Sequence, residues 1–390
     1  MSWPLNVSNF SWIDRLKICK FFLTPSNFWT QSSRVRKYEL AMADLMGFRF
    51  SVFVSSGSTA NTILAMFLKD KIVSLKIDRH IVVLPSTTWQ TSCSPWIREG
   101  FTPHFIDASL SNFGMDLSKL DIFLSDNHNK VAAVFPTSPL GFNINYQELA
   151  RLKQKYPDIS FFIDQCENNF GGFAHKTGGR IKEFTCTTST YMGHELQSVE
   201  GGFIFTNNEE EYRQFLMYRN HGMVRSIDGE DKKRYSNCKV DSRFDFYSLG
   251  NNYRNSDIHA FLGLLDFQRV HQYVISRRDL YFWFRSLLNN DRYILPEDDA
   301  AIPFCLPIIC KGETAFKRLD IIKSYCLENK IETRPIISGF LGYQTPYKQF
   351  MDEKDCPNSV FLHNNGIYIG LNSKVTKTQI IKIVRFLNEI

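Results

Sequence analysis

The chain has 390 residues, of which 43% are hydrophobic and 22% are charged. This composition excludes a mainly disordered chain, because it provides enough apolar surface to offset the entropy lost on folding. The net charge of +6 suits an anionic ligand, but the basic residues are spread thinly, without the concentrated stripe of a nucleic-acid-binding protein. No apolar run reaches the roughly 18 residues needed to cross a membrane.

The nine cysteines are an odd number without paired spacing, which indicates reduced thiols and a cytoplasmic protein. Residues 1–6 contain neither the basic region nor the apolar stretch of a secretion signal, so we expect no export. No histidine or cysteine spacing is typical of a metal site, and we expect none.

Predicted strands and helices alternate along the first 255 residues, which favours an α/β fold. Continuous apolar runs at 131–135 and 159–164 are typical of strands that are covered on both faces. The predicted strands are 50–54, 81–84, 103–107, 131–135, 159–164, 185–188 and 202–206. The predicted helices are 34–46, 59–69, 89–97, 146–155 and 209–219.

A polar, charged loop at 225–242 follows, and its length suggests an active-site flap or an oligomer contact. One long helix from about 256 to 288 would then bridge two domains. We expect a large domain over residues 1–255 and a smaller α+β domain over 256–390. The remaining predicted elements are a strand at 304–310, a helix at 314–329, strands near 331 and at 367–371, and a helix at 376–388.

Residues 56–61, with the sequence SGSTAN, lie between a predicted strand and a predicted helix. Gly57 would let the backbone approach a ligand closely, and N–H groups at a helix start attract phosphate. The alternative is a plain helix start that is capped by Ser58 or Thr59.

Two further features suggest a site. Asp164 ends an apolar strand, where open α/β sheets bind ligands, and it could pair with the protonated ring nitrogen of pyridoxal phosphate. The alternative for Asp164 is an ordinary turn residue. The segment 189–202, STYMGHELQSVEGG, is unusually polar and glycine-rich for a connection between two buried strands. A lone histidine is usually structural, but His194 lies within this segment.

Together these pieces resemble the sugar-nucleotide aminotransferase family of fold-type I pyridoxal phosphate enzymes, over nearly the whole chain. The resemblance implies a large domain with a mixed, mostly parallel sheet and a smaller α+β C-terminal domain. In that family the loop before Glu-Gly-Gly carries a lysine that binds the cofactor covalently, and His194 occupies that position here. The segments that carry the resemblance are 56–60, Asp164, 189–202, 219–222 and 250–254.

A histidine at this position marks, within the family, the 3-dehydratases of 4-keto-6-deoxy sugars. An imidazole cannot form a stable Schiff base, so pyridoxal or pyridoxamine phosphate would be held non-covalently. It can move protons near neutral pH, since its unperturbed pKa is about 6.5. No lysine lies between Lys182 and Lys232 to replace it.

The resemblance also implies which residues bind the cofactor phosphate. Gly57 and Ser58 would do so from the helix start, and Ser189 from the loop. Asn252 would reach the phosphate across the interface of a homodimer, so the active site would be shared between two subunits.

The resemblance assigns the remaining site residues to the cofactor ring and the substrate. Trp89 would stack on the ring, with a core aromatic as the alternative. Asp164 would pair with the ring nitrogen, and Glu167 would lie near the ring hydroxyl, where many relatives have glutamine. Candidates for substrate contacts, which could equally be solvated or capping residues, are Arg219, His221 and Arg334.

The implied reaction removes the C3 hydroxyl of GDP-4-keto-6-deoxy-D-mannose, with L-glutamate as the amino donor and 2-oxoglutarate and ammonia as further products. It would belong to the biosynthesis of colitose-type deoxysugars for O-antigens. No motif reads guanine, so another nucleotide-linked 4-keto sugar and an aminotransferase-like reaction stay open.

Two rivals remain. A CDP-sugar 3-dehydrase also has a histidine here, but it needs an iron–sulfur cluster, and the cysteines lack the close spacing of cluster ligands. A non-catalytic relative that binds sugar nucleotides is the other rival. The presence of Asp164, Ser189, Trp89 and Glu167 argues against a decayed site.

Overall fold

The larger sheet has seven strands in the order β1-β7-β6-β5-β4-β2-β3. The computed structural model describes residues 2–170, 178–227, 229 and 232–390. Four neighbouring pairs of this sheet run parallel, and the two pairs that include β7 run antiparallel. Its strands are β1 (Phe50–Val54), β2 (Ile81–Pro85), β3 (Thr102–Ile106), β4 (Val131–Val134), β5 (Ser160–Asp164), β6 (Thr185–Ser189) and β7 (Gly202–Thr206).

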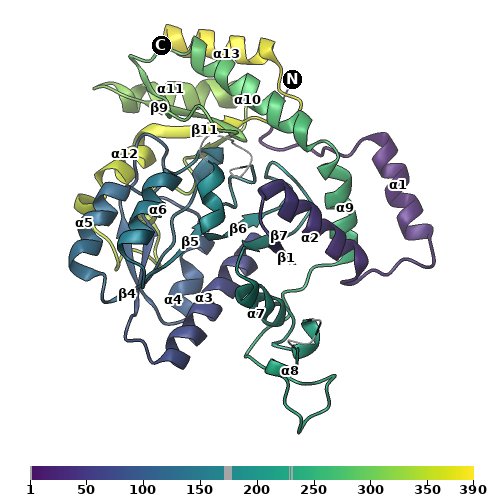
Figure 1. Ribbon diagram of the computed structural model, residues 1–390. Coiled ribbons are helices and arrows are strands. Elements are labelled where there is room, and N and C mark those ends of the chain that lie inside the picture. Colours follow the sequence, from purple (N-terminus) through teal and green to yellow (C-terminus); the bar gives the residue numbers. More distant parts are fainter. Residues whose placement is uncertain (1, 171–177, 228, 230–231) are drawn as a thin grey trace.

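Helices cover both faces of this sheet (Figure 1). Tyr38 and Phe203 belong to the core on one face, and Leu64 and Ile204 to the core on the other. The first face is covered by α2 (Ser33–Met46), α5 (Leu117–Asn127), α6 (Tyr146–Lys155) and α9 (Asp257–Phe267). The second is covered by α3 (Gly57–Leu75), α4 (Ser94–Arg98) and α7 (Glu209–Arg219).

Every residue of β4 is buried, as the continuous apolar run predicts for a strand that is covered on both sides. The strands predicted for this part of the chain are all present, within two residues of the predicted bounds. The expectation of an α/β fold with a mixed, mostly parallel sheet is confirmed.

A second, antiparallel sheet has the strand order β10-β11-β9-β8 and lies at the top of Figure 1. Its core includes Trp3 from the start of the chain as well as residues after 280. The division into domains at residue 255 stays a prediction. The elements are β8 (Tyr293–Ile294), β9 (Cys305–Cys310), β10 (Thr333–Pro335), β11 (Gly366–Gly370), α10 (Val270–Leu287), α11 (Ala315–Glu328), α12 (Pro357–Asn365) and α13 (Lys377–Glu389).

The prediction of one continuous helix over 256–288 is wrong. The chain forms α9 and α10 instead, and Arg269 between them has non-helical backbone angles (φ −109°, ψ 5°). Its guanidinium donates hydrogen bonds to Asp14 at 2.7 Å and to the Tyr273 hydroxyl at 3.0 Å. Arg269 thereby ties the break between the helices to α1 (Trp12–Leu23). Helices α1, α5 and α12 and the short helix within 225–242 were not predicted from the sequence.

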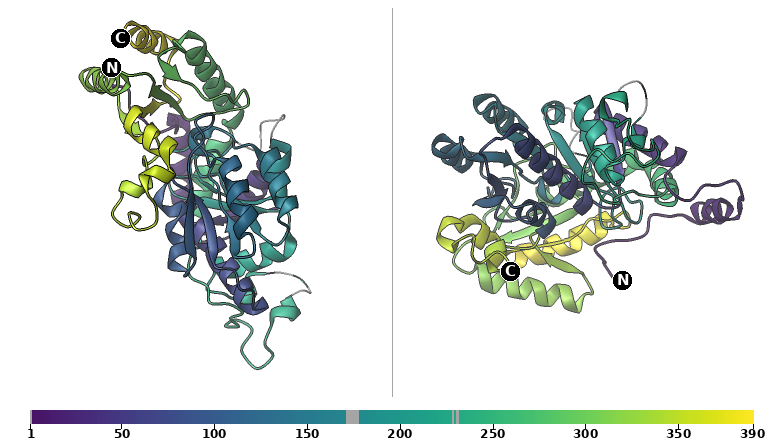
Figure 2. Two further views of the ribbon diagram at one scale, coloured as in Figure 1. Left: turned by 90° about the vertical axis from the view of Figure 1, so that its left-hand side faces the viewer. Right: turned by 90° about the horizontal axis from the view of Figure 1, so that it is seen from below.

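Two segments project from the body of the molecule, and both can be followed in Figures 1 and 2. One contains α1. The other continues the predicted loop 225–242, contains α8 (Lys232–Tyr235), and lies at the end of the molecule opposite the small sheet. Residues 228 and 230–231 of that loop lie outside the described residues.

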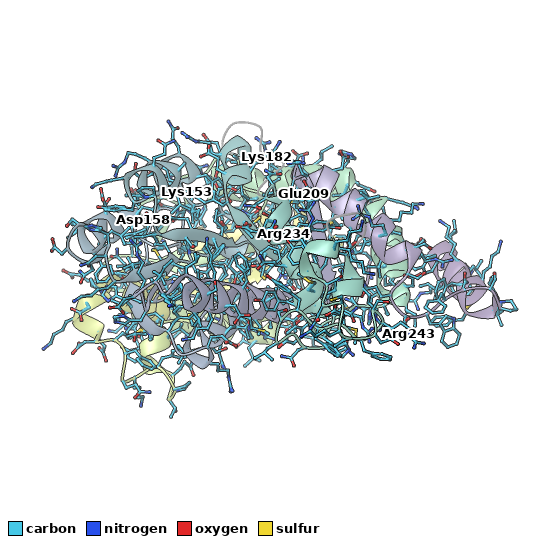
Figure 3. All side chains as sticks on the ribbon, turned by 60° about the horizontal axis from the view of Figure 1, so that its bottom comes forward. Lys153, Asp158, Lys182, Glu209, Arg234 and Arg243 are labelled. Carbon is cyan, nitrogen blue, oxygen red and sulfur yellow. The ribbon has the colours of Figure 1, made fainter. Side chains whose placement is uncertain are left out.

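Charged side chains of both signs are distributed over the molecule (Figure 3). Among the described helices, we find none that is both long and apolar enough to cross a membrane.

The large sheet positions the site because several of its strands end at the same edge. Strands β2, β4, β5 and β6 are parallel neighbours, and β1 shares their direction through two antiparallel pairings with β7. The residues at their carboxyl ends are therefore gathered along one edge of the sheet, where α/β folds bind ligands.

Candidate active site

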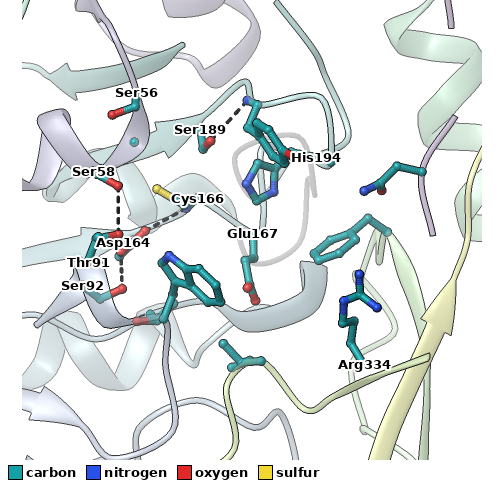
Figure 4. A pocket seen from close by; sticks show the side chains of 18 of the residues that line it. Ser56, Ser58, Thr91, Ser92, Asp164, Cys166, Glu167, Ser189, His194 and Arg334 are labelled. Atoms are coloured by element: carbon teal, nitrogen blue, oxygen red, sulfur yellow. Dashed lines mark hydrogen bonds between the residues drawn. The ribbon is translucent and has the colours of Figure 1, made fainter. Parts of the chain in front are cut away.

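A cavity of about 540 Å³ lies at this edge and extends to the small sheet. Figure 4 shows Asp164 and Ser58 on one side of it, Arg334 on the other, and His194 and Glu167 between them. Eight of the predicted site residues line it: Gly57, Ser58, Trp89, Asp164, Glu167, Ser189, His194 and Arg334.

Asp164, the last residue of β5, is only 1% exposed at the cavity wall. Its Oδ2 accepts hydrogen bonds from the Asn61 amide at 2.9 Å and from the Ser92 hydroxyl at 2.7 Å. Its Oδ1 accepts one from the Cys166 N–H at 2.9 Å. These donors orient a carboxylate that is suited to pair with a protonated ring nitrogen of a ligand.

Helix α3 begins two residues earlier than predicted, and its cap is Ser56 rather than Ser58 or Thr59. The Ser56 hydroxyl accepts a hydrogen bond from the Thr59 N–H at 3.1 Å, and the Thr59 hydroxyl accepts one from the Ser56 N–H at 3.0 Å. This capping box leaves Gly57 and Ser58 in the first turn, beside the cavity. Their N–H groups lie at the positive end of the helix dipole, which favours an anion.

Two glycines allow the start of α3 to pack closely against the end of β6. A Cβ atom on Gly57 would lie 2.6 Å from Cys166 Sγ and 3.0 Å from Ser189 Cβ. A Cβ atom on Gly202 would lie 2.4 Å from the backbone of Ser56. The missing side chains therefore bring Ser189 next to the first turn of the helix.

The segment between β6 and β7 brings His194 to the cavity wall. The Tyr191 N–H donates to the Ser189 hydroxyl at 3.3 Å, and the His194 N–H donates to the Tyr191 carbonyl at 3.0 Å. His194 Nδ1 has no hydrogen-bond partner among the described residues. Burial, with a smaller contribution from the positive charge of Arg277, lowers the pKa of His194 to about 4. The imidazole is therefore neutral at pH 7 and can accept a proton.

Glu167 and Trp89 complete the middle of the cavity. Glu167 Oε2 accepts a hydrogen bond from the Leu140 N–H at 3.0 Å, and burial raises the pKa of Glu167 to about 7. Trp89 is 57% exposed where it lines the cavity, which excludes the alternative that it is a core aromatic. Among the described residues that line the cavity there is no lysine.

Arg219 does not line the cavity. It is 3% exposed, and its guanidinium donates to Glu39 Oε1 at 2.6 Å and to the Phe53 carbonyl at 3.0 Å. It thereby connects α7 to α2 and β1 in the core. The expectation that Arg219 contacts the substrate is therefore corrected. A buried charge must be paired, and the partner of Arg219 lies 180 residues earlier in the chain.

His221 and Asn252 also lie outside the cavity lining. They belong to neighbouring segments: the backbone of Asn252 pairs with that of Asn220, and the His221 N–H donates to the Asn251 carbonyl at 2.8 Å. Asn252 is exposed, and its Oδ1 accepts a hydrogen bond from Arg254 Nε at 3.1 Å. Within one subunit, neither side chain reaches the site.

Several residues of the site were not assigned a role from the sequence. Asn61 belongs to the SGSTAN motif, and the signal that pointed to it was a polar residue one turn into an otherwise apolar helix. No local motif identifies the polar Ser92 or the aromatic Tyr368. The residues that line the cavity without an assigned role are Leu5, Asn6, Ser56, Thr91, Ser92, Thr137, Cys166, Tyr191, Gly193, Glu200, Phe304, Ile337, Tyr368 and Gly370.

Comparison with known proteins gives full-length matches. GDP-4-keto-6-deoxy-D-mannose 3-dehydratase of Escherichia coli O55:H7 is 26% identical over 356 residues, which cover 88% of this chain and 89% of that protein. The protein of the same name from Yersinia pseudotuberculosis is 25% identical over 369 residues and covers 92% of each chain.

A solved structure of the E. coli GDP-4-keto-6-deoxy-D-mannose 3-dehydratase, with bound hydrated PLP, superposes with a TM-score of 0.85. It is 22% identical and covers 99% of both chains. The expected aminotransferase-like fold is thereby confirmed. Residues 22–388 match the model of the DegT/DnrJ/EryC1/StrS aminotransferase family, and the chain belongs to that family.

Proposed function

We propose that this chain is a pyridoxamine-phosphate-dependent 3-dehydratase of GDP-4-keto-6-deoxy-D-mannose, with L-glutamate as the amino donor and 2-oxoglutarate and ammonia as further products. The observation that carries the proposal is His194 at the wall of a cavity that contains no lysine among its described lining residues. The relatives of that name match along nearly the full length of both chains, which supports the same substrate.

The residues of the cavity fit pyridoxal or pyridoxamine phosphate. The N–H groups in the first turn of α3, with Ser58 and Ser189, form a polar cradle for the phosphate, and the missing Cβ of Gly57 lets Ser189 lie next to that turn. Asp164 offers the acceptor for the ring nitrogen, and the exposed indole of Trp89 offers a surface for stacking. Glu167, with its pKa of about 7, can share a proton with the ring hydroxyl.

The cofactor, when bound, supplies an amino group for the C4 ketone and a conjugated system that accepts electrons. His194 would act as the base beside the bound cofactor, because its imidazole is neutral and lines the cavity. The resulting imidazolium would then return its proton to the C3 hydroxyl oxygen of the sugar as that group leaves. A lysine would instead favour a covalent resting state and an ordinary amino transfer.

The diphosphate of the substrate has a candidate partner, Arg334, on the cavity wall opposite Asp164. Arg334 follows the start of β10, lines the cavity, and forms an ion pair with Glu332 at 2.7 Å. Its guanidinium is suited to a diphosphate, since its N–H groups match the spacing of phosphate oxygens. His221 and Asn252 can contribute only from a neighbouring subunit.

We propose that the active unit is a homodimer with the site at its interface. Asn252 follows, within eight residues along the chain, three exposed apolar side chains, Phe244, Phe246 and Leu249. None of the described residues of 225–242 lines the cavity, so an oligomer contact accounts for this segment better than a flap. Exposed apolar surface of this kind is typical of protein interfaces.

The remaining expectations also stay proposals: the large and small domains meeting near residue 255, a cytoplasmic location, and a place in the biosynthesis of colitose-type O-antigen sugars. One relative, from Salmonella typhimurium, is a lipopolysaccharide biosynthesis protein, which supports the last of these.

The decisive experiment incubates the purified protein with pyridoxal phosphate and L-glutamate, and then with GDP-4-keto-6-deoxy-D-mannose. We expect 2-oxoglutarate, a shift of cofactor absorbance to that of the amine form, and a 3-deoxy keto sugar with ammonia by mass spectrometry. His194→Asn is the matched control, because it keeps a polar side chain of similar size but cannot move the proton.

The products distinguish the alternatives. A 4-amino sugar would indicate an aminotransferase, and turnover of only another nucleotide-linked 4-keto sugar would change the substrate. Absence of both 2-oxoglutarate and the amine form of the cofactor would contradict the dehydratase proposal and favour a binding protein.

A further inference from the structure

The first residues of the chain form an additional strand-like segment on the small sheet. The Trp3 N–H donates to the Lys330 carbonyl at 2.8 Å, and the Glu332 N–H donates to the Trp3 carbonyl at 2.9 Å. The buried indole donates to the Gly370 carbonyl at 2.8 Å. Residue 3 is therefore anchored to two strands of the small sheet, β10 and β11, at or near their ends.

The next two residues are held just as firmly. The Asn372 amide donates to the Pro4 carbonyl at 2.7 Å, and the Leu5 N–H donates to Glu332 Oε2 at 3.0 Å. A Cβ atom on Gly370 would lie 2.5 Å from the backbone of Leu5, so the glycine permits this close approach. The segment cannot shift relative to the small sheet without breaking several of these contacts.

Asn6 then extends from this anchored segment to the turn that carries the imidazole. With its amide oriented so that the NH₂ group faces the two carbonyl oxygens, it donates to the Gly193 carbonyl at 3.1 Å and to the Leu5 carbonyl at 3.1 Å. Gly193 directly precedes His194, and a Cβ atom on Gly193 would meet the Asn6 side chain at 3.1 Å. Both Asn6 and His194 line the cavity.

Among the residues that the structure describes, the other side chains that bond to the backbone of this turn do so near its ends. Asn169 donates to the Ser189 carbonyl at 2.8 Å, and Asp266 accepts a hydrogen bond from the Gln197 N–H at 3.0 Å. Between them, the described contacts of the backbone before His194 are those of its own turn and the one from Asn6. Asn6 thus links this backbone to a segment nearly 190 residues earlier in the sequence.

We propose that Asn6 is a positioning residue for His194, and that residues 3–6 transmit the rigidity of the small sheet to the turn that carries it. The inference rests on the proposed function, in which His194 moves the proton. The same segment is bonded to Glu332, whose other oxygen holds Arg334, so the proton-transfer group and the candidate diphosphate ligand share one support. Proton transfer is sensitive to small displacements, since a misplacement of about 1 Å can reduce a rate roughly 100-fold.

The test compares Asn6→Ala and Asn6→Asp with the wild type. Asn6→Asp has the same shape but lacks the donor, and its carboxylate would repel the Gly193 carbonyl. We expect kcat for 3-dehydration to fall about tenfold or more in both variants, with KM for the nucleotide sugar changed less than threefold. Asn6 is exposed, so the melting temperature should change little. Ser8→Ala, two residues further on at another exposed position, is the matched control and should behave as wild type.

A second readout does not depend on activity. Hydrogen–deuterium exchange of peptides that cover 190–200 should be faster in both Asn6 variants than in wild type and in Ser8→Ala. If the wild type turns over and the Asn6 variants match it in kcat and exchange, the positioning role is overturned. If the wild type itself is inactive, the proposed function fails, while the exchange measurement still decides whether Asn6 holds the turn.

Discussion

The surroundings of His194 would lower the pKa of any basic side chain at this position. Burial and the nearby charge of Arg277 lower the pKa of the imidazole to about 4, and the same surroundings disfavour a protonated amine. We therefore expect His194→Lys to bind pyridoxal phosphate covalently and to lose 3-dehydration by about 100-fold or more. Absorbance after desalting checks this: the lysine variant should stay yellow, whereas His194→Asn should release the cofactor. A colourless lysine variant would contradict the assigned position.

The lowered pKa of His194 also predicts how stability depends on pH. Between its usual value of about 6.5 and its folded-state value of about 4, the unfolded chain binds a proton that the folded chain does not. Lowering the pH through this window therefore destabilises the wild type. His194→Asn lacks this contribution, so its free energy of unfolding should gain on that of the wild type as the pH falls. Urea unfolding at pH 7, 6 and 5 measures the difference; a constant difference would contradict the lowered pKa.

At the scale of elements, the start of α3 combines a stability role with a binding role. Ser56→Ala removes the cap and should lower the free energy of unfolding by about 1 kcal/mol. It should also weaken pyridoxal phosphate binding, because the first-turn N–H groups lose their fixed orientation. Ser11→Ala is the matched control, since Ser11 caps α1 with the same kind of capping box. That variant should leave cofactor affinity unchanged, and titration followed by absorbance compares the two.

At the scale of the whole molecule, the exposed residues that follow the loop 225–242 test the proposed dimer. Leu249, three residues before Asn252, is 89% exposed in the single chain. We expect wild type to sediment as a dimer of the 45.4 kDa chain, and Leu249→Glu to dissociate it and reduce cofactor retention. Leu327→Glu, at a residue that is 80% exposed on α11, is the control and should stay dimeric. A monomeric wild type, or a dimeric Leu249→Glu, would contradict this interface.

The large-sheet strands, which depend on neighbouring residues in the sequence, were predicted correctly, and two features that depend on distant partners were not. The strands of the large sheet were predictable because apolar runs such as 131–134 are buried on both faces. The break at Arg269 was not, because the apolar pattern continues across it and the partner of Arg269, Asp14, lies 255 residues earlier in the chain. Arg219 was misjudged for the same reason, since its partner Glu39 comes from a distant helix.

The sequence by itself determined the strands of the large sheet, the family resemblance and the exchange of lysine for histidine, because these depend on residue type and on local periodicity. Only the tertiary structure decided that Asn61 and Ser92 orient Asp164 and that Asn6 reaches the backbone next to His194. Side-chain partners of this kind are separated by tens to nearly two hundred residues in the sequence, and they are selected when strands and helices pack, not by any pattern along the chain.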